Sequence, residues 1–121
     1  MKIVLNPREE EIMQILWRLQ KAFVKDIIAE LEDPNTPYNT VSSIVRKLAG
    51  EGHIGFTAYG NTHQYHPILK KGDYTQSSFR HLFEKYFDAS AEQLLSFFIK
   101  EEKVDPASLE ALVKKLKNEE K

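Results

Sequence analysis

The chain has 121 residues, of which 41% are hydrophobic and 29% are charged, and its formal net charge at neutral pH is −1. This length allows one domain or two small ones. Because the sequence has no cysteine, it excludes disulfides, cysteine-ligated zinc and thiol chemistry. The first residues are too short an apolar run for a signal peptide, and no stretch approaches the ~20 apolar residues of a membrane span. We therefore expect a cytoplasmic protein that is not inserted in a membrane.

The positive charges are unevenly distributed along the chain. Between Pro37 and Lys71 four basic residues stand against a single acidic one, a local balance of +3, whereas acidic residues concentrate before and after this stretch. A basic region within an otherwise acidic chain is compatible with a surface that meets a nucleic acid.

Two helices are expected before this basic stretch. Asn6 can cap the first one, with Pro7 at its first position and Glu9 closing a capping box. Apolar residues then recur at helical spacing, at Ile12, Met13, Ile15, Leu16, Trp17 and Leu19. The second helix is expected from about Val24 to Leu31.

A third helix is expected over residues 37–49, after a turn rich in proline and asparagine, with Thr36 as its cap. Its inward face is apolar, with Val41, Ile44, Val45 and Leu48. Its opposite face carries short uncharged polar groups and one arginine, at Asn39, Ser42, Ser43 and Arg46. An ordinary surface helix would carry glutamate and lysine there, whereas small hydroxyl and amide groups suit close contact with base edges and phosphates. We interpret this segment as a recognition helix; the alternative is a plain solvent-facing surface.

A β-hairpin is expected directly after this helix. Side chains alternate in character from Ile54 to Tyr59, Gly60 opens a turn, and a return strand runs from His63 to His66. Three helices followed by a hairpin are the elements of a winged helix-turn-helix, in which the hairpin is the wing. The residues expected to contact DNA are Lys25, Tyr38, Asn39, Thr40, Ser42, Ser43, Arg46, Lys47, Tyr59, Asn61, Thr62 and His63.

The second half of the chain is predicted to be helical again. Residues 70–73 are interpreted as a hinge, Ser90 opens a helix with a capping box, and Asp105 with Pro106 opens another. So short a segment would bury its many large apolar groups poorly alone, so we expect it to pair with a second copy. The expected dimerisation residues are Phe79, Phe83, Phe87, Leu95, Phe98, Leu112 and Leu116. The predicted fold is therefore mostly α with a small β-hairpin: a winged-helix DNA-binding domain over residues 1–71 and a three-helix dimerisation domain over residues 72–121.

Five groups of residues follow one another in a fixed order along the chain. They are Glu11-Ile12-Met13 with Leu16-Trp17, Val24-Lys25-Asp26-Ile27, Tyr38-Asn39-Thr40-Val41, Lys47-Leu48 with Gly52, and Gly60 with Tyr65-His66-Pro67. This ordered set resembles the penicillinase-repressor family, the small winged-helix repressors of β-lactamase, methicillin-resistance and copper-homeostasis operons. The resemblance covers about residues 6–116.

The resemblance implies a homodimer that binds a palindromic operator in double-stranded DNA, for an operon of the β-lactamase or antibiotic-response type. In the β-lactamase branch, a membrane sensor protease signals the presence of the antibiotic, and the repressor is cut at an Asn-Phe bond in its dimerisation domain. The stretch that matches is Leu95-Ser96-Phe97-Phe98, in which Ser96 stands where the family has asparagine. The candidate cleavage site is therefore the bond between Ser96 and Phe97. Members often carry a basic residue after the wing glycine, where this chain has Asn61, and the cysteine motif of the copper branch is missing.

The sequence offers no workable set of catalytic residues, and we expect no enzyme activity, no cofactor and no metal site. His63 and His66 are three residues apart, which on a strand puts them on opposite faces. Two alternatives to an operator-binding repressor controlled by cleavage stay open. One is a winged-helix module that binds other proteins. The other is a repressor released by a small molecule, bound in a pocket near Tyr65, Tyr74 and Phe79.

Overall fold

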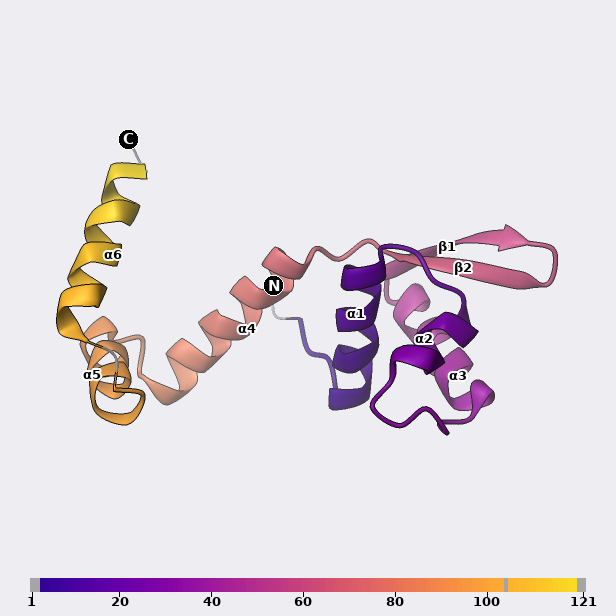
Figure 1. Ribbon diagram of the computed structural model, residues 1–121, viewed down its shortest axis with the longest axis horizontal. Helices are drawn as coiled ribbons and strands as arrows, with labels where there is room; N and C mark the ends of the chain where they lie inside the picture. Colours follow the sequence, from indigo (N-terminus) through magenta and orange to yellow (C-terminus); the bar gives the residue numbers. More distant parts are fainter. Residues whose placement is uncertain (1–2, 104, 120–121) are drawn as a thin grey trace. The chain divides into compact units, whose positions relative to one another are not determined.

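The computed structural model describes the backbone of residues 3–103 and 105–119, and the side chains of all these residues except 112, 113 and 115–119. The elements are α1 (Pro7–Leu19), α2 (Val24–Glu30), α3 (Tyr38–Gly50), β1 (Ile54–Tyr59), β2 (Thr62–Pro67), α4 (Lys71–Tyr86), α5 (Ala91–Glu101) and α6 (Pro106–Glu119) (Figure 1). The prediction of a mostly helical chain with one hairpin is confirmed. The contacts between residues divide the chain into two compact units, Met1–Ser78 and Phe79–Lys121. Within the described residues, no helix combines the length and the apolar character needed to cross a lipid bilayer.

The first helix begins with the predicted capping box. The Asn6 side chain accepts a hydrogen bond from the backbone N–H of Glu9 at 2.8 Å, and the Glu9 carboxylate accepts one from the backbone N–H of Asn6 at 2.9 Å. Two backbone donors that the helix cannot use are thereby satisfied. This cap fixes the start of α1 and also holds the Glu9 side chain in one position.

The turn between α2 and α3 differs from the prediction. The Thr36 hydroxyl donates to the backbone carbonyl of Asp33 at 2.7 Å, so it closes the turn and does not cap the next helix. Pro37 is the N-cap of α3 and makes no side-chain bond there. The prediction of a Thr36 cap is therefore wrong, while the body of α3 lies within one residue of its expected bounds.

The hairpin is antiparallel, with pairs running from Ile54 opposite Pro67 to Tyr59 opposite Thr62. Gly60 has a φ of 63°, a backbone conformation that glycine adopts without steric cost. An isolated bridge between Ala22 and Tyr65 joins the hairpin to the segment that precedes α2. Figure 1 shows the two strands extending beyond the three helices as a wing.

One hydrophobic core holds the first unit together. It is built from the inward faces of α1, α2 and α3, with one residue from the segment before α2, one from each hairpin strand and one from the start of α4. The buried members are Ile12, Met13, Ile15, Leu16, Trp17, Ala22, Val24, Ile27, Leu31, Val41, Val45, Leu48, Ile54, Tyr65 and Tyr74. The three members from α3 have no exposed surface, so the rotation of this helix about its axis is fixed by packing.

The predicted hinge at residues 70–73 is wrong, because α4 begins at Lys71 and continues without interruption to Tyr86. Gly72 is accommodated within its first turn. Tyr74, in the next turn, belongs to the core of the first unit. The boundary between the two units falls later, between Ser78 and Phe79, inside the helix.

The second unit comprises the rest of α4 with α5 and α6. Ser90 accepts a hydrogen bond from the backbone N–H of Gln93 at 3.2 Å, and Asp105 accepts one from Ala107 at 3.2 Å, as caps of α5 and α6. No described side chain from Phe79 to Lys114 is fully buried. This unit therefore has helices with apolar faces but no dry core among its described residues.

Candidate nucleic-acid interface

The face of α3 that points away from the core carries the predicted polar residues. Asn39, Ser43 and Arg46 are exposed, and Thr40 and Ser42 are half-buried. Because the opposite face is anchored by three completely buried apolar side chains, the polar face cannot rotate inward. Helical side chains at this spacing form one continuous surface.

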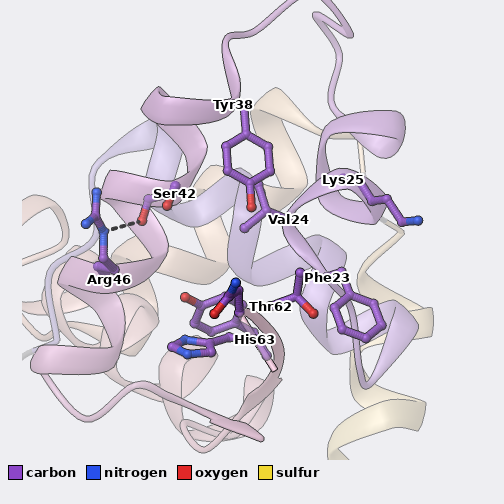
Figure 2. A pocket seen from close by; sticks show the side chains of 10 residues that line it. Phe23, Val24, Lys25, Tyr38, Ser42, Arg46, Thr62 and His63 are labelled. Carbon is purple, nitrogen blue, oxygen red and sulfur yellow. Dashed lines mark hydrogen bonds between the residues drawn. The ribbon is translucent and has the colours of Figure 1, made fainter. Parts of the chain in front are cut away.

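Arg46 lies along the surface of its own helix. Its Nε donates to the backbone carbonyl oxygen of Ser42 at 3.3 Å, which leaves the end of the guanidinium free (Figure 2). Among the described residues, neither Arg46 nor Lys25 has a carboxylate oxygen within 4.0 Å of its charged nitrogens. Both cations are thus available to an external anion.

Lys47 has a different environment from Arg46. Its Nζ lies 2.6 Å from Glu9 Oε2, while the nearest oxygen of Glu51 is 3.9 Å away. Glu9 is only 3% exposed. Burial opposes ionisation of its carboxyl, but the hydrogen bonds from Lys47 and from the Asn6 backbone outweigh this effect and hold the pKa of Glu9 below its usual value. The hydrogen bond between Lys47 and Glu9 also raises the pKa of Lys47. Lys47 therefore ties α3 to the first turn of α1, and a phosphate would have to compete with Glu9 for its charge.

A groove of about 420 Å³ lies between the start of α2, the outward face of α3 and the hairpin. It is lined by Phe23, Val24, Lys25, Tyr38, Ser42, Arg46, Asn61, Thr62, His63 and Tyr65. Figure 2 shows Tyr38 and Arg46 of α3 facing Thr62 and His63 of the hairpin, with Phe23 and Lys25 at the other end. The fold thus brings most of the predicted DNA-contacting residues to one concave surface, although they come from three separate segments.

The groove also has an aromatic wall, of which the sequence analysis named only Tyr38 as a DNA-contacting residue. Tyr65 is buried, and burial is the main reason why the pKa of its phenol is raised, with Arg46 opposing the shift. Phe23 packs edge-on against Tyr59 with the ring centroids 6.0 Å apart. Tyr38 is 55% exposed and supplies a hydroxyl at the rim. The alternation of β2 predicts that Tyr65 points inward, but the position of Phe23 depends on the Ala22–Tyr65 bridge and has no local sequence signal.

The tip of the wing is ordered by short-range contacts. The Thr62 hydroxyl donates to the backbone carbonyl of Tyr59 at 2.9 Å. The imidazole of His63 stacks on the ring of Phe56, with centroids 4.2 Å apart and planes inclined by 7°. Asn61, Thr62 and Tyr59 are exposed at the tip. Of the predicted DNA-contacting residues, five lie outside the groove lining, on the rest of α3 and at the wing tip: Asn39, Thr40, Ser43, Lys47 and Tyr59.

The four phenylalanines among the predicted dimerisation residues take part in aromatic contacts within the second unit. The rings of Phe79 and Phe83 stack with centroids 5.7 Å apart, and Phe97 meets Phe87 and Phe98 edge-on at 5.5 and 6.3 Å. Leu95 is exposed and Phe98 half-buried, while the side chains of Leu112 and Leu116 lie outside the described residues. The candidate cleavage residues, Ser96 and Phe97, are both exposed on α5.

Comparison with solved structures places the winged unit among known folds. The chain is similar to the solution structure of the DNA-binding domain of the repressor BlaI, with a TM-score of 0.51 and 22% sequence identity over 61% of this chain and 94% of that one. At this identity the likeness shows the fold, a winged helix. No curated protein matches the chain significantly.

Comparison with family models covers almost the whole chain. The model described as penicillinase repressor matches residues 5–118, which span both units. The chain therefore belongs to the penicillinase repressor family of DNA-binding transcriptional repressors.

Proposed function

We propose that this repressor binds a palindromic operator as a homodimer and controls an operon of the β-lactamase or antibiotic-response type. The observation that carries the DNA-contacting part is the outward face of α3, where short polar side chains and a free guanidinium stand beside a groove with a second free cation. A protein-binding module would have no need for this combination of a short polar face on α3 and two cations, Arg46 of α3 and Lys25 of α2.

In the proposed complex α3 enters the major groove. Arg46 releases Ser42 and bonds a guanine edge or a phosphate. At the start of the helix, Asn39, Thr40 and Ser43 contact base edges or position the helix on the DNA. Short side chains allow the helix backbone to approach the bases closely. This arrangement accounts for the exposed serine, where a longer charged residue would be ordinary.

The groove beside α3 would receive the sugar-phosphate backbone. Lys25 and Tyr38 stand on the helical side and Thr62 and His63 on the wing, so hydrogen-bond donors come from both walls. Contacts of this kind fix the register of a protein on DNA without reading its sequence. They also make the affinity fall steeply with salt, because each neutralised phosphate releases counterions.

The second unit supports the homodimer. Its described part buries no side chain completely, yet large apolar groups such as Phe79, at 48% exposed, and Phe97, at 41%, lie on its surface. Contiguous exposed apolar surface marks interaction sites in soluble proteins. A second copy of the same helices would cover it with a self-complementary surface, as in most two-fold dimers.

Relief of repression is proposed to follow cleavage between Ser96 and Phe97, driven indirectly by a membrane sensor protease. Both residues are exposed, but the bond lies within α5, so this helix must open locally before a protease can bind it in an extended form. Removing the helices beyond the cut would destroy the dimer and leave two weakly bound monomers.

The dimer is tested by light scattering on the full-length protein and on Phe98→Glu, with Lys100→Glu as a control on an exposed position of the same helix. Dimeric wild type and control with a monomeric Phe98→Glu variant are expected, since a buried interface does not accept an unpaired carboxylate. A Phe98→Glu variant that remains dimeric would contradict the proposed interface. Footprinting on DNA from upstream of the gene should show two protected half-sites.

Cleavage is tested in cells grown with and without a β-lactam. Mass spectrometry of the recovered repressor should find a fragment ending at Ser96 only after exposure. Derepression of the target genes with an intact repressor would contradict the proteolytic mechanism and favour release by a ligand.

A further inference from the structure

Tyr74 attaches the start of α4 to the winged unit. Its side chain is 9% exposed, its ring lies 5.8 Å from that of Trp17, and its hydroxyl donates to Glu10 Oε2 at 2.7 Å. Burial first, and then the bond to Glu10, raise the pKa of the Tyr74 phenol, so the hydroxyl stays protonated and remains a donor. The contact joins residues 64 positions apart in the sequence.

Two further bonds hold the same segment. Trp17 Nε1 donates to the backbone carbonyl of Leu69 at 2.7 Å, just before α4. The backbone N–H of Ile3 donates to Ser77 Oγ at 3.1 Å, one turn after Tyr74. The chain from Leu69 to Ser77 is thus part of the winged unit and cannot act as a flexible tether.

These contacts within the winged unit affect where the chain leaves it, and so how two linked DNA-binding units reach two half-sites. When two binding units are joined, the effective concentration of the second unit at its half-site depends on the length and stiffness of the link. It falls when the link cannot place both units on their half-sites at once. A fixed exit from each winged unit favours a narrow range of half-site separations. If this segment were loosened, the dimer would bind operators with a wider range of half-site separations, but its affinity for the operator with the optimal separation would be lower.

We propose that Tyr74 is a positioning residue that determines which spacing between operator half-sites the repressor accepts. The inference rests on the proposed homodimer. Tyr74 belongs to α4 and packs against Trp17 of α1, and it is not among the residues that line the DNA-facing groove, so it acts on spacing and not on the reading of a half-site. Its ring contact with Trp17 holds the first turns of α4, up to Ser78, within the winged unit, and its bond to Glu10 fixes the rotation of the side chain.

The test compares the full-length wild type with Tyr74→Phe, which removes only the hydroxyl. Thr75→Ala is the matched control, because its hydroxyl bonds the carbonyl of Lys71 in its own helix. Glu10→Ala is a second variant that removes the acceptor and keeps the tyrosine. Fluorescence anisotropy measures binding to three kinds of duplex, namely the footprinted operator, a single half-site, and operators with one or two base pairs inserted between the half-sites. Thermal unfolding is recorded for every variant.

We expect Tyr74→Phe and Glu10→Ala to bind the half-site like the wild type and the operator about tenfold more weakly, with a smaller penalty for inserted base pairs. Thr75→Ala should match the wild type on every duplex. A spacing preference like that of the wild type in both variants would overturn the proposal. An equal loss of affinity for the half-site and for the operator would also overturn it, because it indicates that Tyr74 has a role in folding only. A wild type that binds half-site and operator with equal affinity would overturn the homodimer itself, a result visible without any variant.

Discussion

Replacing Glu9 with glutamine tests whether the pair between α1 and α3 stabilises the winged unit. Glutamine has nearly the same shape, and its amide oxygen can still accept the backbone N–H of Asn6. It cannot form the charged bond to Lys47 that spans 38 residues of sequence. The change therefore isolates the ionic part of the contact from the capping box.

The size of the effect follows from the surroundings of the two groups. A hydrogen bond to a charged group contributes about 1.5–3 kcal/mol. The Lys47 side chain is 59% exposed, so solvent screens the pair from that side and the lower end of the range applies. A loss of about 1.5 kcal/mol corresponds to a decrease in Tm of about 6–12 °C for a domain of 60–100 residues.

The same pair predicts a dependence of stability on pH. Because the pKa of Glu9 is lower in the folded protein than its usual value of 4.5, folding favours the ionised form. The stabilisation is then fully present above 4.5 and is lost as the pH falls through the folded-state pKa. The stability difference between wild type and Glu9→Gln should be constant near neutral pH and shrink in acid.

The assay is thermal unfolding by circular dichroism over a series of pH values from neutral to acid. Glu51→Gln is the matched control, since it removes the other carboxylate near Lys47, an exposed i,i+4 partner at 3.9 Å. It should change Tm by no more than about 3 °C. A Glu9→Gln variant as stable as the wild type, or a difference that grows in acid, would refute the reasoning.

Two other predictions concern α3. Ser43→Glu puts a carboxylate on the reading face and should weaken operator binding in a gel shift by about tenfold or more, because it repels phosphates. The control Gln14→Glu, on the exposed side of α1, should leave operator binding unchanged. Equal operator affinity of the two variants would contradict the assignment of this face of α3 to DNA. Leu48→Ala removes a completely buried side chain and should lower the free energy of unfolding in urea by about 2–5 kcal/mol. Ile68→Ala, at a side chain 56% exposed, should cost about 0.5 kcal/mol or less. A small loss in Leu48→Ala would mean that α3 is not anchored through this face.

The local elements were predictable from the sequence because their signals are local. The Asn6–Glu9 capping box depends on residues three apart, and the hairpin follows from an alternating pattern closed by Gly60. Thr36 shows the limit of such reasoning. A hydroxyl before a helix can cap it or close the preceding turn, and only the path of the chain at Asp33 decides between them.

Contacts between distant segments could not be predicted. The interpretation of residues 70–73 as a hinge relied on lysines and a glycine, but α4 begins at Lys71 and the ring of Tyr74 packs against Trp17 of α1. The exposed polar face of α3 was expected from helical periodicity. Its groove was not, because the aromatic wall at Phe23 depends on how the hairpin pairs with Ala22.

The measurement that most directly tests operator reading by α3 is a gel shift with wild type, Arg46→Ala and Arg18→Ala over a range of salt concentrations. Arg18 is the matched control, because it is an exposed arginine on α1 that pairs with Glu30 at 3.2 Å. The account predicts that Arg46→Ala loses about 1–3 kcal/mol of specific binding, roughly 5- to 150-fold in Kd, while Arg18→Ala binds like the wild type. If Arg46→Ala retained the wild-type affinity for the operator, the outward face of α3 would not be the surface that reads DNA.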